Sequence, residues 1–136
     1  MSVREPERDE SKIEFIKVLM DIEKWCLRKS ETAPKKYRFM INNQLIKHSA
    51  DAYTYAKMAN SIKVRDSDTR QMRENYFTRA YISLQAFSSQ IDVIYEICRN
   101  DFMTIKEHKQ IAKDTFNGLR LINGIVKSDK ERYKEI

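Results

Sequence analysis

Apolar residues recur at the period of an α-helix through most of the chain, most clearly over residues 34–62. This stretch has no glycine, and its single proline, Pro34, stands in the first turn, where a missing N–H costs nothing. At 100° per residue, one face collects Tyr37, Ile41, Leu45, His48, Ala52, Tyr55, Ala59 and Ile62. The pattern predicts a helix that buries this face in a bundle.

A second apolar set lies on another side of the same predicted helix. Its members are spaced by seven residues: Phe39, Ile46 and Tyr53. An apolar stripe outside the core face normally marks an interface. Every copy of the chain carries the stripe, so we expect self-association through these three residues, with a hetero-partner as the alternative.

Three further amphipathic stretches complete the prediction. The four helices are expected at about 12–29, 33–63, 68–99 and 104–130, within one domain over residues 12–134. Residues 1–11 are mostly charged and predict a disordered lead-in. Three pairs fit the capping box, in which a side chain at each end satisfies a backbone N–H at the other: Ser11 with Glu14, Asp68 with Gln71, and Thr104 with Glu107.

The composition favours long helices over a sheet. The 136 residues include only two glycines and two prolines, and 34% are charged. Four helices joined by short turns predict an all-α protein, an antiparallel up-down-up-down four-helix bundle. Both glycines, Gly118 and Gly124, fall inside the last predicted helix, where each costs about 1 kcal/mol relative to alanine. They predict close backbone approach, inside the bundle or between subunits.

The positive charge is concentrated in the second helix. The chain has a net charge of +6, and residues 32–64 hold six Lys or Arg against Asp51 alone, a net of +5. Such asymmetry indicates an anionic partner, most commonly nucleic acid, whereas the alternative is a merely solvated face.

Catalytic patterns are missing from the sequence. No Glu-x-x-His pair of a di-metal bundle, no arrangement of nucleophile and base, and no glycine-rich phosphate loop is found. We therefore expect no enzyme activity, no cofactor and no metal. His48 and His108 fall at core-facing positions of different helices; a metal between them is the alternative to two satisfied core histidines. Cys26 and Cys98 predict reduced thiols, and the lack of a signal or membrane segment predicts a cytoplasmic protein with no membrane contact.

Several segments resemble the accessory variability determinant (Avd) family of diversity-generating retroelements. They are PKKYRF at the start of the second helix, Asn43, Leu45 and Ala52–Tyr53 within it, the third helix rich in small and apolar residues, and the closing KSDKERY. The resemblance spans residues 12–134. The four-helix bundles encoded in 23S ribosomal RNA intervening sequences are related to this family and share its fold.

The resemblance implies a pentameric barrel of four-helix bundles with a positive surface. Such a homopentamer would bind the element's reverse transcriptase and its structured template RNA, or an RNA/DNA hybrid. It would support mutagenic cDNA synthesis and retrohoming without an active site of its own. By charge and position, the RNA-binding candidates are Lys35, Lys36, Arg38 and Lys47, followed by Arg120, Lys127, Lys130 and Arg132. The alternative is an intervening-sequence-type oligomer of undefined role without a polymerase partner.

Overall fold

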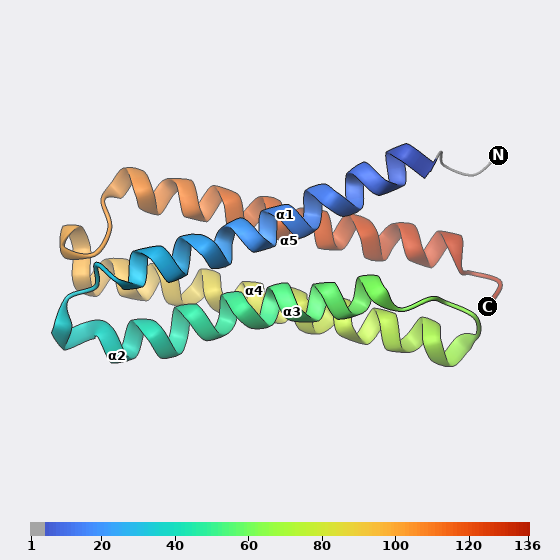
Figure 1. Ribbon diagram of the computed structural model, residues 1–136, viewed down its shortest axis with the longest axis horizontal. Coiled ribbons are helices and arrows are strands. Elements are labelled where there is room, and N and C mark those ends of the chain that lie inside the picture. Colours follow the sequence, from blue (N-terminus) through green and yellow to red (C-terminus); the bar gives the residue numbers. More distant parts are fainter. Residues whose placement is uncertain (1–4) are drawn as a thin grey trace.

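The computed structural model describes the backbone of residues 5–136 and the side chains of residues 14–136, and it is helical almost throughout (Figure 1). No strand forms in this range. The long helices are α1 (Glu5–Ser30), α4 (Ser67–Cys98) and α5 (Ile105–Arg132). A composite helix stands between α1 and α4: η1 (Lys35–Tyr37), α2 (Arg38–Ile41), η2 (Asn42–Ile46) and α3 (Lys47–Ser61). A short 3₁₀ turn, η3 (Arg99–Asp101), precedes α5.

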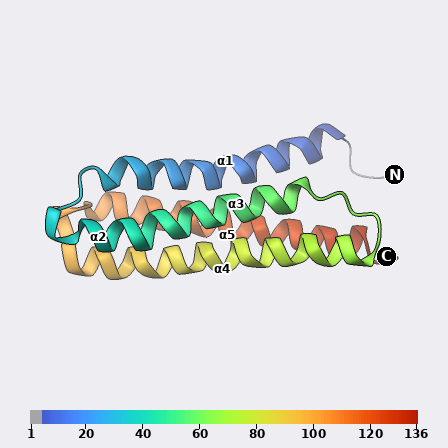
Figure 2. The same cartoon turned by 60° about the horizontal axis from the view of Figure 1, so that its bottom comes forward.

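These four long helical segments lie side by side as a bundle (Figures 1 and 2). Helix α1 packs against α3 and α5, and α4 packs against the same two helices. The connection into η1 and the η3 turn lie at one end, which we call the α2 end. The connection between α3 and α4 and the end of α5 lie at the other, which we call the α5 end. The all-α, four-helix prediction is confirmed.

Each helix contributes one buried stripe to a shared core. The stripes follow helical spacing and are rich in phenylalanine, leucine, isoleucine and alanine. They comprise Phe15, Leu19, Ile22 and Cys26 on α1; Ile41, Leu45, Ala52, Ala56 and Ala59 on the composite helix; Phe77, Ala80, Leu84, Phe87, Ile91 and Ile94 on α4; and Ile111 and Ile122 on α5. Gly118 also lies on the buried stripe of α5, which confirms close approach inside the bundle.

The start of α1 differs from the prediction. The helix begins at Glu5 and runs through Ser11, so Ser11 is not an N-cap. Pro6 falls in the first turn, where proline does not interrupt a helix. Of the predicted lead-in over residues 1–11, residues 5–11 are therefore helical, and residues 1–4 lie outside the described part of the chain.

Two helix starts show how local chemistry sets the boundaries. Helix α4 is capped by Asp66 and Thr69 instead of Asp68 and Gln71: Thr69 N–H donates to Asp66 Oδ1 at 2.8 Å, and Asp66 N–H donates to Thr69 Oγ1 at 3.1 Å. The Thr104–Glu107 box is confirmed, with Glu107 N–H donating to Thr104 Oγ1 at 3.1 Å. Threonine can accept at the third helical position as glutamate does, and this moves the α4 cap two residues earlier.

The composite helix is interrupted by the π-helical segment η2. A π turn is wider than an α turn and changes the direction in which later side chains point. Within this segment and on either side of it, Ile41, Leu45, Ala52 and Ala59 are buried as predicted. The buried stripe of α3 also includes Ser49 and Ala56, while His48 and Tyr55 are only half-buried. The prediction at a constant 100° per residue was wrong at these positions.

Candidate nucleic-acid interface

The eight predicted RNA-binding residues do not form one surface. Lys35, Lys36 and Arg38 lie at the α2 end and form the α2-end basic cluster, which Lys47 follows at the start of α3. Lys127, Lys130 and Arg132 close α5 and form the α5-end basic cluster. Arg120 lies between the two clusters along α5. At 1.5 Å per residue the bundle is on the order of 40 Å long, so a single contact cannot include both clusters.

The segment that carries the α2-end basic cluster contains no acidic residue. Residues 32–47 contain four cations and no Asp or Glu. All four are exposed, and none forms an ion pair with any side chain of residues 14–136. Lys36 Nζ lies 4.9 Å from the centre of the Tyr37 ring, and Arg38 donates to the Ala33 carbonyl at 3.4 Å. These contacts orient the cations without neutralising them, so their field stays available to an anion.

The α5-end basic cluster is mixed with acids. Residues 127–136 hold four cations and three carboxylates, a net of +1. Lys134 pairs with Glu131 at 2.9 Å, and Asp129 is taken up by Arg73 on α4. Farther along α5, Arg120 donates to the Asn117 side chain at 2.6 Å. Residues 127–136 therefore carry less unpaired positive charge than residues 32–47.

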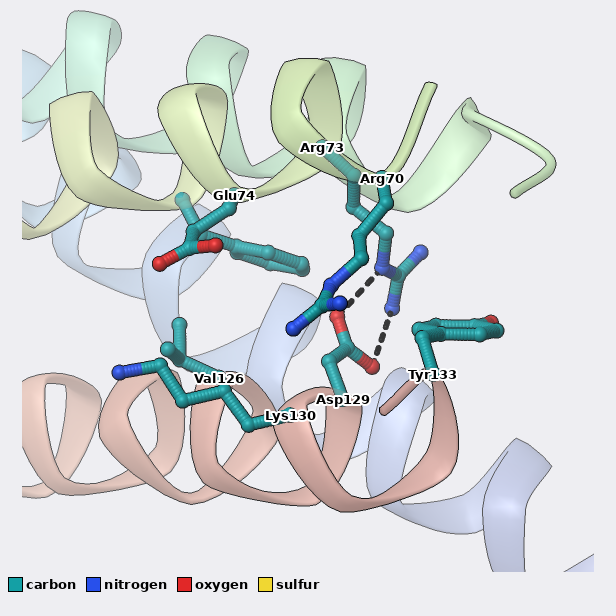
Figure 3. Close-up of a pocket in the computed structure, with 8 residues that line it drawn as sticks. Arg70, Arg73, Glu74, Val126, Asp129, Lys130 and Tyr133 are labelled. Atoms are coloured by element: carbon teal, nitrogen blue, oxygen red, sulfur yellow. Dashed lines mark hydrogen bonds and ion pairs between the residues drawn. The ribbon is translucent and has the colours of Figure 1, made fainter. Parts of the chain in front are cut away.

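A shallow pocket at the α5 end contains the most buried charge in the described chain (Figure 3). Arg73 is 5% exposed; its Nε donates to Asp129 Oδ2 at 2.6 Å and its Nη1 to the Ala59 carbonyl at 3.3 Å. The guanidinium also lies 4.9 Å from the centre of the Phe77 ring. These contacts join α4 to α5 and α3. The pocket is therefore built around an ion pair that has a structural role. Helix α5 continues through Asp129 to Arg132, two residues beyond the predicted end.

The histidines do not come together. His108 Nε2 lies 3.0 Å from Asp92 Oδ1, and its ring stacks on Tyr95 with the centres 4.2 Å apart. His48 is half-buried on α3, and no hydrogen bond of the described side chains joins it to His108. Within the described chain no three His, Cys, Asp or Glu side chains gather as a metal site.

The two thiols, Cys26 and Cys98, are free and buried. Burial raises the pKa of both thiols, that of Cys26 to about 12. A thiol held protonated in this way is a poor nucleophile.

The predicted interface stripe is not a continuous exposed surface. Phe39 is 81% exposed, but Ile46 and Tyr53 are half-buried and pack against the core. The η2 turn lies between Phe39 and Tyr53, so the seven-residue spacing does not keep them on one outer face. Self-association stays a prediction.

The large exposed apolar side chains of α4 form an outer stripe instead. They are Met72, Ile82, Val93 and Ile97, and they are spread along the length of α4 outside its buried stripe. Residues 80–91 of α4 contain no charged side chain, a signal that was visible in the sequence.

Within residues 5–136 no helix combines the length and apolarity that a membrane span needs. Comparison of the chain with protein-family models, curated proteins and solved structures gives no match.

Proposed function

We propose that this chain is a non-catalytic RNA-binding protein that contacts structured RNA through the α2-end basic cluster. The observation that carries the proposal is the run of four exposed cations without a carboxylate over residues 32–47. Phosphate contacts by such cations release counterions and supply most of the affinity for nucleic acid. A metal cluster or an activated nucleophile is not needed for this role.

The biological setting that we propose is a diversity-generating retroelement. The resemblance to the Avd family supports it through PKKYRF, Asn43, Leu45 and KSDKERY. In this role the chain forms an antiparallel bundle that assembles into a cytoplasmic pentameric barrel and binds the element's reverse transcriptase and template RNA, or an RNA/DNA hybrid. Polymerisation chemistry belongs to the partner enzyme. The alternative, an intervening-sequence-type oligomer, has the same bundle without a polymerase partner.

The first experiment locates the RNA contact with a matched pair of variants. Lys35→Glu/Lys36→Glu reverses two charges at the α2 end, and Lys127→Glu/Lys130→Glu makes the same change at the α5 end. We expect the first variant to lose binding to a structured RNA and to lower the slope of log affinity against log salt by about 1.5. The second should lose far less, and circular dichroism should show equal helicity in both.

Three results would contradict this assignment. Equal losses in the two variants would show that the charge of the whole molecule matters, not the α2 end. A loss confined to the α5-end variant would move the interface there. Absence of RNA binding by the unchanged protein at low salt would overturn the proposed function itself.

The response to a reverse transcriptase distinguishes the retroelement role from the intervening-sequence-type alternative. If the chain supports a retroelement, adding the polymerase encoded beside it should raise the affinity for the template RNA, and the two proteins should co-purify. RNA binding that is indifferent to the polymerase would favour the intervening-sequence-type alternative.

A further inference from the structure

Phe39 is the most exposed large apolar side chain among those that the structure describes, with 81% of its surface accessible. Single exposed apolar residues are common and need no explanation by themselves. Phe39, however, stands inside the α2-end basic cluster, directly after Arg38. Its surroundings, and not its exposure alone, indicate a ligand.

The turns on either side of Phe39 carry two kinds of polar group. Lys35 and Lys36 stand one turn before Phe39 in the sequence, and Asn42 and Asn43 stand one turn after it. All four side chains are exposed. Over residues 14–136, neither amide has a hydrogen-bond partner, and neither ammonium has an ion-pair partner.

Two of these side chains belong to the π-helical turn η2. Asn42 and Asn43 open η2, whose only buried residue is Leu45. π turns inside helices occur frequently at functional sites. The order along the chain is therefore cation, aromatic ring, amide, and none of these groups is used in holding the bundle together.

We propose that Lys35, Lys36, Phe39, Asn42 and Asn43 form a binding site for an unpaired nucleotide of RNA. The base stacks on the Phe39 ring, the ammonium groups contact the phosphates beside it, and the amides hydrogen-bond to the base edge. The inference rests on the proposed function and narrows the ligand from structured RNA to its unpaired nucleotides. A base inside a duplex has both faces covered by neighbours, so the site takes loops, bulges or single strands.

The charges around Phe39 argue against a two-fold contact with a second copy of the chain. A two-fold contact centred on Phe39 would bring Lys35, Lys36 and Arg38 of one copy against the same three cations of the other. Like charges at close range disfavour such a contact, whereas a strand of phosphates is complementary to it.

The test compares a single-stranded oligouridylate with an RNA duplex of the same length. Phe39→Leu keeps an apolar side chain but removes the aromatic face, and Phe39→Trp keeps that face. We expect Phe39→Leu to weaken oligouridylate binding about tenfold and duplex binding less than about twofold. The salt slope should not change, because no phosphate contact is lost. Phe39→Trp should bind as the unchanged protein does, with tryptophan fluorescence quenched by the bound base.

Phe116→Leu is the matched control, because Phe116 is 69% exposed on α5 and is also flanked by cations, Lys113 and Arg120. It should leave oligouridylate binding unchanged. If the unchanged protein binds neither RNA, the proposed function fails.

If the protein binds RNA but Phe39→Leu affects neither form, or both equally, only the stacking inference is overturned. The stacking inference is also overturned if RNA binding persists in Phe39→Leu while another property is lost. Loss of binding to phosphatidylserine vesicles would assign Phe39 to a lipid surface, and dissociation of an oligomer would assign it to a subunit contact.

Discussion

At the scale of single residues, Gly118 and Gly124 of α5 meet opposite surroundings. A Cβ atom at Gly118 would lie 2.9 Å from Leu84 Cδ2 and 3.5 Å from Leu19 Cδ2, whereas none of the described atoms lies within 4 Å of one at Gly124. Neither glycine has a positive φ. The close approach predicted for both glycines is therefore found at Gly118, and the packing of one chain gives no reason for Gly124.

The two alanine variants should accordingly move stability in opposite directions. Gly124→Ala should raise the free energy of unfolding by about 0.5–1 kcal/mol, because alanine loses less backbone entropy in a helix. Gly118→Ala makes the same gain but crowds Leu84 at the centre of the core, and overpacking costs about 1–3 kcal/mol, so we expect a net loss. Urea denaturation of both variants checks this. A stabilised Gly118→Ala would show that Leu84 gives way without cost.

Arg73 marks the limit of prediction at this scale. Arg73 stands at core spacing with Phe77 and Ala80, but the apolar pattern on which the prediction rested does not include an arginine. Its partner was not visible, because Asp129 lies 56 residues later in a charged stretch where every carboxylate looks alike. Contacts between distant helices leave no periodic signal in either one.

At the scale of helices, the number and type of elements could be predicted because apolar periodicity is strong and the connecting turns are polar. The expected boundaries 68–99 and 104–130 lie within two residues of α4 and α5. The composite helix was harder, since nothing in NNQLI distinguishes a π turn from an α turn. The positive charge of the candidate site could therefore be predicted from the sequence. The exposure of Phe39, in contrast to the half-buried Ile46 and Tyr53, could not.

The N-terminus of α5 shows a pH dependence that can be tested. Glu107 completes the cap with Thr104 and pairs with Lys29 of α1, the Oε2–Nζ distance being 2.9 Å. The Lys29 hydrogen bond is the main cause that lowers the pKa of Glu107 below 4.5. Because the folded pKa is the lower one, this stabilisation is present above the unfolded pKa and is lost as pH falls through the folded value.

Glu107→Gln isolates the charge, because glutamine preserves the capping box. At pH 7 we expect the variant to be less stable by a few tenths of a kcal/mol, a small effect because the pair is partly exposed. The difference should close as the pH falls below about 4.5. Chemical denaturation near neutrality and at about pH 3 measures it. A difference that persists in acid would assign the loss to the cap hydrogen bonds.

At the scale of the whole molecule, residues 32–47 at the α2 end carry four cations without a carboxylate, together with the exposed Phe39. Helix α4 carries the exposed apolar side chains Met72, Ile82, Val93 and Ile97. Helices α1 and α4 lie on opposite sides of the bundle in Figure 2, and their Phe15 and Phe77 rings meet in the core with centres 5.8 Å apart. The side of α4 that faces away from α1 is therefore open to a second copy of the chain.

Self-association should use this α4 face. Copies with a net charge of +6 repel one another, and the charge-free stretch over residues 80–91 is where they approach at least electrostatic cost. Ile82→Lys/Val93→Lys should therefore reduce the mass measured by light scattering to that of a monomer, with helicity unchanged. Ile105→Lys, at a side chain 56% exposed at the start of α5, is the control and should leave the assembly intact.

The mass of the unchanged protein is measured first. A monomeric mass would contradict self-association altogether. A mass of five subunits would match the resemblance to the Avd family. Dissociation of the Ile105→Lys control as well would move the interface off α4. The α4 variant is then tested for RNA binding. If it is monomeric, still binds oligouridylate, and loses apparent affinity only for long RNA, each copy carries a complete nucleotide site. The assembly then acts by multivalency, since linked sites gain affinity for a strand long enough to reach several of them.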